Sequence, residues 1–337
     1  MTSTHPGIRL EPRDEYMHAV DGATTFNESM YVNVFDPERG LGGFLRLGNR
    51  PLEGHAELTV CLFLPDGRVG FWFDRPQIGD NEAFDAGGMR IEVVEPFKEL
   101  TWAYAGKALL LDDPAVLDDP KAAFTGSPRT QCRAELTIEG LSPMLGGEPT
   151  EEIAEPHGGA FAKGHYEQHV AVRGRLEVGD ESWEVGGYGL RDHSWGPRFW
   201  QAPWWYRWLT ANFGPDRGFV ASVIASRDGG RTVGGVLFED GAYSLLRDVA
   251  VDTDWSGDPQ SPQRIRLTAS TRHKTMTAEG VVHRLVPLRN RRRSPDGEQM
   301  VTRIAEGATE WRWDGAVGFG MSEYLDQMVE GVPAGLL

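Results

Sequence analysis

Histidine and carboxylate side chains alternate along one short segment near the middle of the chain. Residues 164–170 read GHYEQHV. In a β-strand, side chains two residues apart point to the same face, so His165, Glu167 and His169 would share a face. Buried polar groups must be paired, so three titratable groups on one face favour either a solvated sheet surface or a site that lines a cavity.

A second segment with chemically active side chains is predicted to pair with the first. Alternation of residue types runs through 165–178, stops at a Gly-Asp turn, and resumes through 181–195, which is typical of a β-hairpin. Pairing across this turn would bring the histidines and Glu167 of the first strand close to Asp192 or His193 of the second.

The second strand of this hairpin divides its side chains between two faces. Tyr188 and Asp192 would lie on one face, and His193 and Trp195 on the other. Glycine inside a strand often marks a bulge, or the close approach of a ligand or another backbone. Such glycines occur here at three positions: Gly186, Gly187 and Gly189.

Tryptophans are concentrated directly after this hairpin. Five of the 11 tryptophans lie within residues 195–208. If they surround Asp192, they would remove water from its carboxyl, raise its pKa towards neutrality and make it a candidate general acid. The alternative interpretation is ordinary core packing, because indoles are large groups that are usually buried. The tryptophans predicted to bind an apolar substrate are Trp195, Trp200, Trp204 and Trp205, and Tyr188 and His169 are predicted to bind it with them.

A metal site is an alternative interpretation of the same histidines. His165, Glu167 and His169, with His193 from the neighbouring strand, could form the His/carboxylate site of a cupin-like barrel. The sequence contains no cysteine-rich zinc spacing and no glycine pattern of a nucleotide-binding loop. We therefore predict a site that uses neither a metal nor a cofactor.

One further carboxylate could contact a substrate. Residues 311–324 read WRWDGAVGFGMSEY, and Glu323 follows a Gly-x-Gly pattern at the expected end of the last strand. Glu323 is predicted either to line the mouth of a cavity or simply to end the strand.

The composition is that of an ordinary globular protein with an acidic surface. The chain has 337 residues, of which 40% are hydrophobic and 25% are charged, and its net charge is −16. This charge argues against nucleic-acid binding. The N-terminus lacks the apolar segment of a signal peptide, and no apolar run is long enough to span a membrane. With two free cysteines, the chain is predicted to be cytoplasmic.

Short β-strands separated by turn sequences account for most of the chain. The 42 glycines and 21 prolines disfavour long helices, although a short helix is predicted around 114–124. Regularly spaced strands without interleaved helices predict an all-β fold of two stacked, barrel-like halves. We expect an N-terminal domain over 15–195, a C-terminal domain over 196–327 and a tail over 328–337. The clearest strands of the first half are expected at 30–36, 55–64, 67–74, 89–96, 99–106 and 132–140.

Two sequence motifs resemble those of a known family. YGLRDHSWG (188–196) and WDGAVGFGMSEY (313–324) are similar to signatures of the carotenoid 1,2-hydratase (hydroxyneurosporene synthase) and AttH-like family. The resemblance implies two lipocalin-like antiparallel β-barrel or sandwich halves packed together. It also implies cofactor-independent addition of water to a terminal isoprenoid double bond.

The resemblance also implies roles for particular residues. Asp192 matches the aspartate that protonates the alkene in this family, and His193 and Trp195 match the motif directly. The chain departs from the pattern at Leu190, where the family has tyrosine, and at Glu167, where it has tryptophan. These departures put a carotenoid substrate in doubt but leave acid–base chemistry on an apolar substrate.

These observations predict a cofactor-independent acid–base enzyme that is a hydratase, dehydratase, isomerase or cyclase. Asp192 would donate a proton to an apolar terpenoid, steroid or polyketide-like substrate. Glu167, with His165 or His193, would position water or accept a proton. The expected partner is a hydrophobic small molecule and not a nucleic acid, with transient membrane contact during substrate uptake. The alternatives are a non-catalytic lipocalin-like carrier and the cupin-like metal enzyme.

Overall fold

The fold is nearly all antiparallel β-sheet, which confirms the predicted fold class. The computed structural model describes residues 7–150, 162–257, 260–293 and 299–337. Within these ranges no helix has the length and apolar character needed to cross a membrane.

The chain divides into two compact units. Unit 1 comprises Met1–Asp113 and Phe124–Phe199, and unit 2 comprises Pro114–Ala123 and Trp200–Leu337. The short helix predicted around 114–124 is present as two consecutive helical turns, η3 (Pro114–Asp118) and α1 (Pro120–Gly126).

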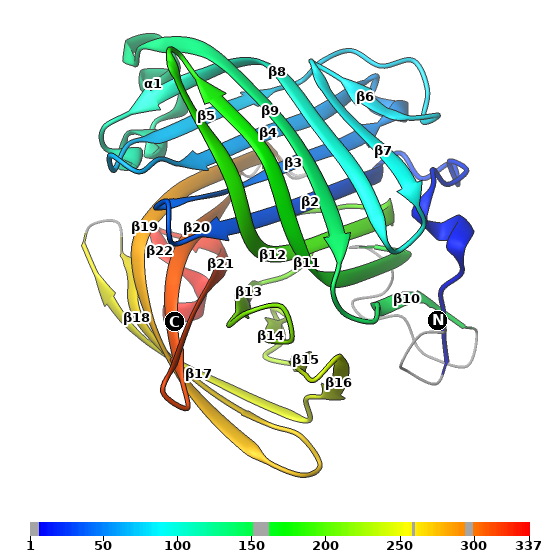
Figure 1. Cartoon of the computed structure of the whole chain (residues 1–337), viewed down its shortest axis with the longest axis vertical. Helices are drawn as coiled ribbons and strands as arrows, with labels where there is room; N and C mark the ends of the chain where they lie inside the picture. The colour runs from blue at the N-terminus through cyan, green and yellow to red at the C-terminus, as the bar shows by residue number, and fades with distance from the viewer. Residues whose placement is uncertain (1–6, 151–161, 258–259, 294–298) are drawn as a thin grey trace. The chain divides into compact units, whose positions relative to one another are not determined.

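Eight strands of unit 1 form a closed antiparallel ring, in which each strand pairs with two neighbours. In ring order they are β2 (Phe26–Asp36), β3 (Leu41–Arg50), β4 (His55–Phe63), β5 (Val69–Asp74), β8 (Glu99–Leu111), β9 (Arg129–Gly140), β11 (Gly164–Val178) and β12 (Glu181–Pro197), which pairs back with β2. Figure 1 shows β2, β3 and β4 side by side.

Shorter elements extend this ring. They are β1 (Ile8–Arg9), β10 (Leu145–Pro149), β6 (Phe84–Ala86) and β7 (Met89–Glu95), with the helical turns η1 (Pro12–Glu15) and η2 (Pro51–Glu53). β10 pairs with β11, and β7 pairs with β8.

Alternate residues of the ring strands form the core of unit 1. Met30 and Val32 on β2 belong to this core, as do Val170 and Val172 on β11 and Val185 on β12. Burial of these aliphatic side chains stabilises the ring. Because side chains alternate along a strand, the residues between them point away from the core. This alternation decides which side chains around Asp192 can meet.

Strand β3 is not evident in the sequence pattern because glycines interrupt its alternation. Gly43 has φ 144°, and a Cβ at this position would lie 2.2 Å from the carbonyl oxygen of Cys61 on β4. Glycine is therefore required where β3 and β4 approach closely.

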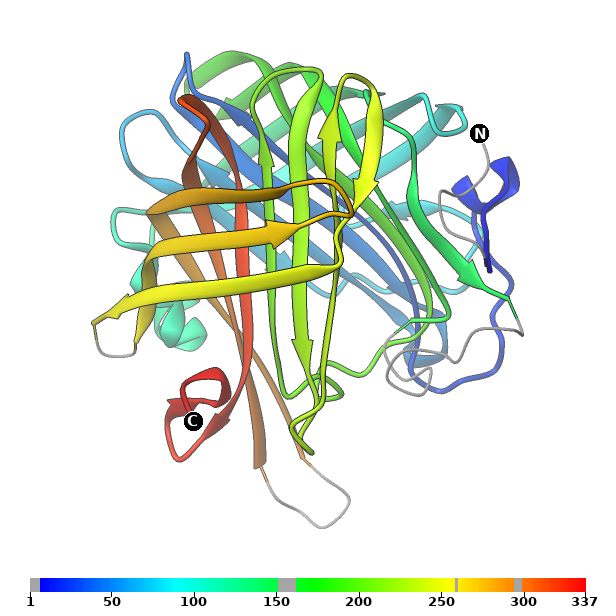
Figure 2. The ribbon, with the colours of Figure 1, turned by 90° about the horizontal axis from the view of Figure 1, so that it is seen from below.

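Unit 2 contains a single antiparallel sheet whose hydrogen-bonded order starts with β16 and ends with β17. The order is β16 (Ala242–Leu245), β15 (Arg231–Glu239), β14 (Arg217–Ala225), β13 (Trp205–Asn212), β21 (Ala316–Val329), β20 (Gln299–Trp313), β19 (Thr275–Arg293), β18 (Ser261–Ser270) and β17 (Asp248–Ser256). β22 (Val332–Pro333) pairs with β21 and is followed by η5 (Ala334–Leu336). Figure 2 shows β17 and β18 lying across β14 and β15.

The core of unit 2 is rich in aromatic side chains. Trp311 and Trp313 on β20 are fully buried, and their rings contact Phe219 and Phe213 edge to face. Such geometry is favoured between aromatic rings. Two of the chain's tryptophans therefore serve packing.

Candidate functional site

The predicted hairpin of β11 and β12 is confirmed, and its register sets the candidate site. Glu167 lies directly opposite Asp192, and His165 lies opposite Ser194. Val170 and Val172 on β11 point into the core of unit 1, so His165 and Glu167 point to the opposite face of the sheet. Asp192 shares that face with them.

The three side chains form a compact acid–base cluster. His165 Nε2 lies 3.0 Å from Asp192 Oδ2 and 3.8 Å from Glu167 Oε1. The side chain of His165 is 42% exposed, that of Asp192 is 23% exposed, and Glu167 is buried. The imidazole is thus open on one side and held by a carboxylate on the other, which is the arrangement that proton transfer needs.

The pKa of Asp192 moves opposite to the direction predicted from its sequence surroundings. Burial raises the pKa of this carboxyl, but the hydrogen bond and charge of His165 outweigh burial, so its pKa lies below the ordinary value. For His165, burial lowers the pKa, but the hydrogen bond and charge of Asp192 outweigh it and raise the pKa. The expectation that the surroundings raise the pKa of Asp192 was therefore wrong, because the hydrogen bond and charge of His165 lower this pKa.

His193 and Trp195 lie on the other face of β12, as strand alternation predicts. Both are buried on the core side of unit 1, where the ring of Trp195 stacks on that of His18 at a centroid distance of 3.9 Å. Trp195 therefore does not share the face of Asp192. The cupin-like set of His165, Glu167, His169 and His193 is also wrong as one site, because the strand separates His193 from the other three.

His193 belongs to a buried polar network. Its Nδ1 lies 3.1 Å from the hydroxyl of Tyr166, which donates a 2.7 Å hydrogen bond to Glu15. Arg191 binds Glu15 through two hydrogen bonds of 2.6 and 2.9 Å. Burial raises the pKa of Glu15, but the charge and hydrogen bonds of Arg191 outweigh burial and lower it. Glu15 is therefore an ion-paired carboxylate inside unit 1.

A second buried carboxylate continues this network. Glu28 Oε1 lies 2.7 Å from His18 Nδ1 and 3.0 Å from His193 Nε2, while Glu28 Oε2 accepts a 2.6 Å hydrogen bond from Asn81. Burial raises the pKa of Glu28, but the hydrogen bonds to both histidines outweigh burial and lower this pKa to about 2. Glu28 is a carboxylate throughout the neutral pH range.

Sequence reasoning missed several members of this network, namely Glu15, His18, Glu28 and Tyr166. One signal was present in β2, where Glu28 alternates in phase with the apolar residues Phe26, Met30 and Val32. A charged residue in phase with a core face must be paired when it is buried. The identity of its partners could not be read from the sequence, because they come from distant segments.

Two of the three glycines near Asp192, Gly187 and Gly189, lie where the backbone of β2 approaches closely. A Cβ on Gly187 would lie 2.2 Å from the carbonyl oxygen of Phe35, and a Cβ on Gly189 would lie 1.8 Å from that of Asn33. Asn33 also accepts a 2.9 Å hydrogen bond from the backbone N–H of Leu190 through its side chain. These contacts explain the glycines through the close approach of β2 to β12.

Two other predicted substrate-binding residues lie on the face of Asp192. Tyr188 is half-buried opposite Ala171, and His169 is fully buried opposite Leu190. His169 shares a face with Glu167 but lies one step further along β11.

The remaining predicted substrate-binding residues belong to unit 2. Trp205 packs against the unit 2 core and beneath the guanidinium of Arg207, whereas Trp204 contacts Arg227. Trp200 precedes these two, and its carbonyl accepts a hydrogen bond from Gln327. They are not in the unit that holds Asp192.

Glu323 lies within β21 and not at the end of a strand, which corrects the placement expected from sequence. β21 continues to Val329. Glu323 accepts a hydrogen bond from the hydroxyl of Tyr206 and lies opposite Trp208 on β13 and Glu306 on β20.

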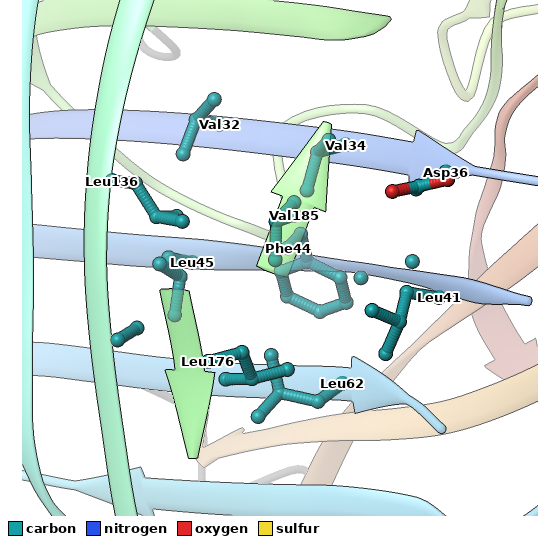
Figure 3. A pocket seen from close by; sticks show the side chains of 13 residues that line it. Val32, Val34, Asp36, Leu41, Phe44, Leu45, Leu62, Leu136, Leu176 and Val185 are labelled. Carbon is teal, nitrogen blue, oxygen red and sulfur yellow. The ribbon is translucent and has the colours of Figure 1, made fainter. Parts of the chain in front are cut away.

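A small pocket of about 30 Å³ lies in unit 1. Figure 3 shows side chains from several strands converging around it. Its lining is almost entirely apolar and includes Val32, Leu45, Leu136, Leu176 and Val185. These residues belong to the core face, so the pocket and Asp192 lie on opposite faces of the sheet.

Comparison with known protein families identifies the family to which the chain belongs. The sequence pattern of a family described as a domain of unknown function, DUF7064, matches residues 11–328. The chain belongs to this family. The DUF7064 match includes the candidate site and parts of both units. No curated protein matches the sequence significantly.

Two solved structures show that this DUF7064 fold occurs in other proteins. A candidate AttH protein from Nitrosomonas europaea has a TM-score of 0.57 at 15% identity, with 97% of this chain and 99% of that chain covered. Kievitone hydratase from Nectria haematococca has a TM-score of 0.56 at 9% identity, with 97% and 95% covered. At these identities the likeness establishes the two-part β-fold alone.

Proposed function

We propose that this DUF7064 protein is an acid–base enzyme of the hydratase type. The observation that carries the proposal is the 3.0 Å contact between His165 Nε2 and Asp192 Oδ2, with Glu167 Oε1 3.8 Å from the same nitrogen. An imidazolium between two carboxylates on a partly exposed face can both supply and recover a proton. The fold shared with kievitone hydratase supports this class of reaction.

The chain's own residues can complete hydration of an alkene with water as the only co-substrate. The proton held between His165 and Asp192 passes to one alkene carbon, and the π electrons form the new C–H bond. Water then forms a C–O bond to the adjacent carbon, and Glu167 accepts the proton that this water loses. Return of that proton from Glu167 to the His165–Asp192 pair restores the starting state. Dehydration is the same sequence reversed.

The role of Asp192 in this proposal differs from that expected from sequence. The lowered pKa of Asp192 and the raised pKa of His165 favour His165 as the resting proton holder, with Asp192 orienting the ring and stabilising its charge. Isomerisation and cyclisation start with the same protonation step. An apolar terpenoid, steroid or polyketide-like substrate, taken up in the cytoplasm, remains part of the proposal.

Incorporation of heavy-oxygen water provides the test. The purified protein is incubated in H₂¹⁸O with panels of terpenoids, steroids and polyketides that contain isolated double bonds, and products are analysed by mass spectrometry. Wild type should yield a product that has gained one labelled water. Asp192→Asn and His165→Gln should each lower the rate by about 10²–10⁴-fold, the usual contribution of a positioned acid or base.

Glu184→Gln supplies the matched control, because Glu184 lies on the same strand with a 70% exposed side chain and should retain full activity. Full activity in Asp192→Asn or His165→Gln would overturn the assigned roles. Absence of any labelled product across all three panels would overturn the proposed reaction on these substrates.

A further inference from the structure

Three side chains from separate segments converge in the buried network of unit 1. His18 precedes β2, Glu28 lies on β2 and His193 lies on β12. Their ligand atoms, His18 Nδ1, Glu28 Oε1 and His193 Nε2, all lie within 4.8 Å of one another. The Glu28 and His193 side chains are fully buried, and that of His18 is 18% exposed.

Each of these side chains also has a polar neighbour on the side away from its ligand atom, and for Glu28 this neighbour donates hydrogen bonds. Glu28 Oε2 accepts hydrogen bonds from Asn81 Nδ2 at 2.6 Å and from the backbone N–H of His18 at 2.9 Å. His193 Nδ1 lies 3.1 Å from the hydroxyl of Tyr166. His18 Nε2 lies 3.6 Å from Asp14 Oδ1. Outer partners of this kind orient metal ligands and fix which imidazole nitrogen is free to bind.

The two imidazoles converge on one carboxylate oxygen. His18 Nδ1 lies 2.7 Å and His193 Nε2 lies 3.0 Å from Glu28 Oε1. Three potential ligand atoms from three separate segments are therefore grouped around one position.

We propose that His18, Glu28 and His193 form a binding site for one divalent transition-metal ion of the Zn²⁺ class. Two imidazoles and one carboxylate are a ligand set that Zn²⁺ and its neighbours bind well. The ion joins the segment before β2 to two ring strands, which gives it a structural role. Because this site lies on the opposite face of β12 from Asp192, the inference does not depend on the proposed hydratase activity.

Metal content and metal titration test the site. Untagged protein, purified without chelators or metal-affinity resin, should contain about one zinc-class ion per chain by elemental analysis. Stripped protein should bind Co²⁺ with 1:1 stoichiometry at micromolar concentration, observed through the visible bands of the bound ion. The same addition should raise its unfolding temperature.

Two variants separate this site from adventitious binding. His18→Gln removes the most exposed ligand and should weaken Co²⁺ binding by more than about 100-fold, and Tyr166→Phe should weaken it by about 10-fold, since outer partners contribute 10–100-fold. His283→Gln is the matched control, because His283 is a 53% exposed histidine that lies 3.4 Å from Glu310, and it should bind Co²⁺ like wild type. Absence of stoichiometric binding by wild type, or undiminished binding by His18→Gln, would overturn the proposal.

Discussion

At the residue scale, charge partners decide the chemistry of the candidate site more than burial does. Asp192 is partly buried, yet the imidazolium of His165 at 3.0 Å lowers the pKa of its carboxyl. Sequence reasoning could place these two residues together because strand alternation and a hairpin turn are local patterns. It could not determine the direction of the pKa shift, because the hydrogen bond and charge of His165 outweigh the effect of burial on the Asp192 carboxyl.

The His165–Asp192 pair should make stability depend on pH in a defined window. The raised pKa of His165 stabilises the fold at low pH, and this stabilisation is lost as pH rises through the raised value. The lowered pKa of Asp192 stabilises the fold at high pH, and this is lost as pH falls through the lowered value. The pair should therefore stabilise the folded state most between pH 3.8 and pH 6.5, which are the ordinary pKa values of an aspartate and a histidine side chain.

Urea unfolding of wild type and His165→Gln across pH 3–9 checks this prediction. The difference in unfolding free energy should peak at about 0.5 kcal/mol inside the window, because solvent screens a partly exposed pair. A difference that stays constant over the whole pH range would contradict it.

Breaking the buried Glu15–Arg191 pair by removing one partner should cost far more unfolding free energy than breaking an exposed pair. Both side chains are almost completely inaccessible to solvent. Arg191→Met leaves the Glu15 carboxylate without its cation, which should cost about 3–5 kcal/mol in unfolding free energy. Adding Glu15→Gln removes the uncompensated charge and should recover much of this loss. Urea denaturation of Arg191→Met and of the Arg191→Met, Glu15→Gln double variant measures both changes in unfolding free energy. A loss below about 1 kcal/mol in Arg191→Met would show that the pair is dispensable.

At the scale of elements, β12 supports two separate sites because its successive side chains face opposite ways. Asp192 joins His165 and Glu167 on one face, while His193 and Trp195 join the buried network on the other. The alternation itself was predictable from sequence. The pairing of β12 with β2 was not predictable from sequence, because these two strands are far apart in the chain and meet only where the ring closes.

The close approach of β2 to β12 makes one glycine indispensable and leaves another replaceable. Gly189→Ala would place a Cβ 1.8 Å from the carbonyl oxygen of Asn33, whereas Gly186→Ala would place it 3.7 Å from the flexible end of Arg39. Forcing the two strands apart should cost about 1–3 kcal/mol. Thermal unfolding should show a lower melting temperature for Gly189→Ala and a nearly unchanged one for Gly186→Ala. Equal melting temperatures for the two variants would refute the steric explanation.

At the scale of the whole molecule, the all-β class followed from sequence but the buried network did not. Regular strand spacing and abundant turn residues predict the class. The network draws on Glu15, Glu28, Asn81, Tyr166 and His193, which the sequence separates widely and only the closed ring of unit 1 brings together. Local patterns carry no information on such distant contacts.

The two cysteines provide a chemical reporter of unit 1. Cys61 and Cys132 are both buried in unit 1, and neither forms a disulfide bond. Burial raises the pKa of the Cys132 thiol to about 12, so almost no reactive thiolate is present at pH 8. Ellman's reagent should therefore react with neither cysteine in the native protein and with both in denaturant. Fast labelling of the native protein would show that unit 1 opens readily.

The two faces of β12 also bear on how relatives in the DUF7064 family should diverge. Under the proposed function, adjacent residues in this strand would be subject to different selective pressures, one from the reaction and the other from the interior of unit 1. Relatives that lack the proposed reaction should change at Asp192 while they keep Arg191, His193 and Trp195. In an alignment of such relatives, substitutions at positions two residues apart in β12 would then correlate with each other. Substitutions at adjacent positions in β12 would be nearly independent.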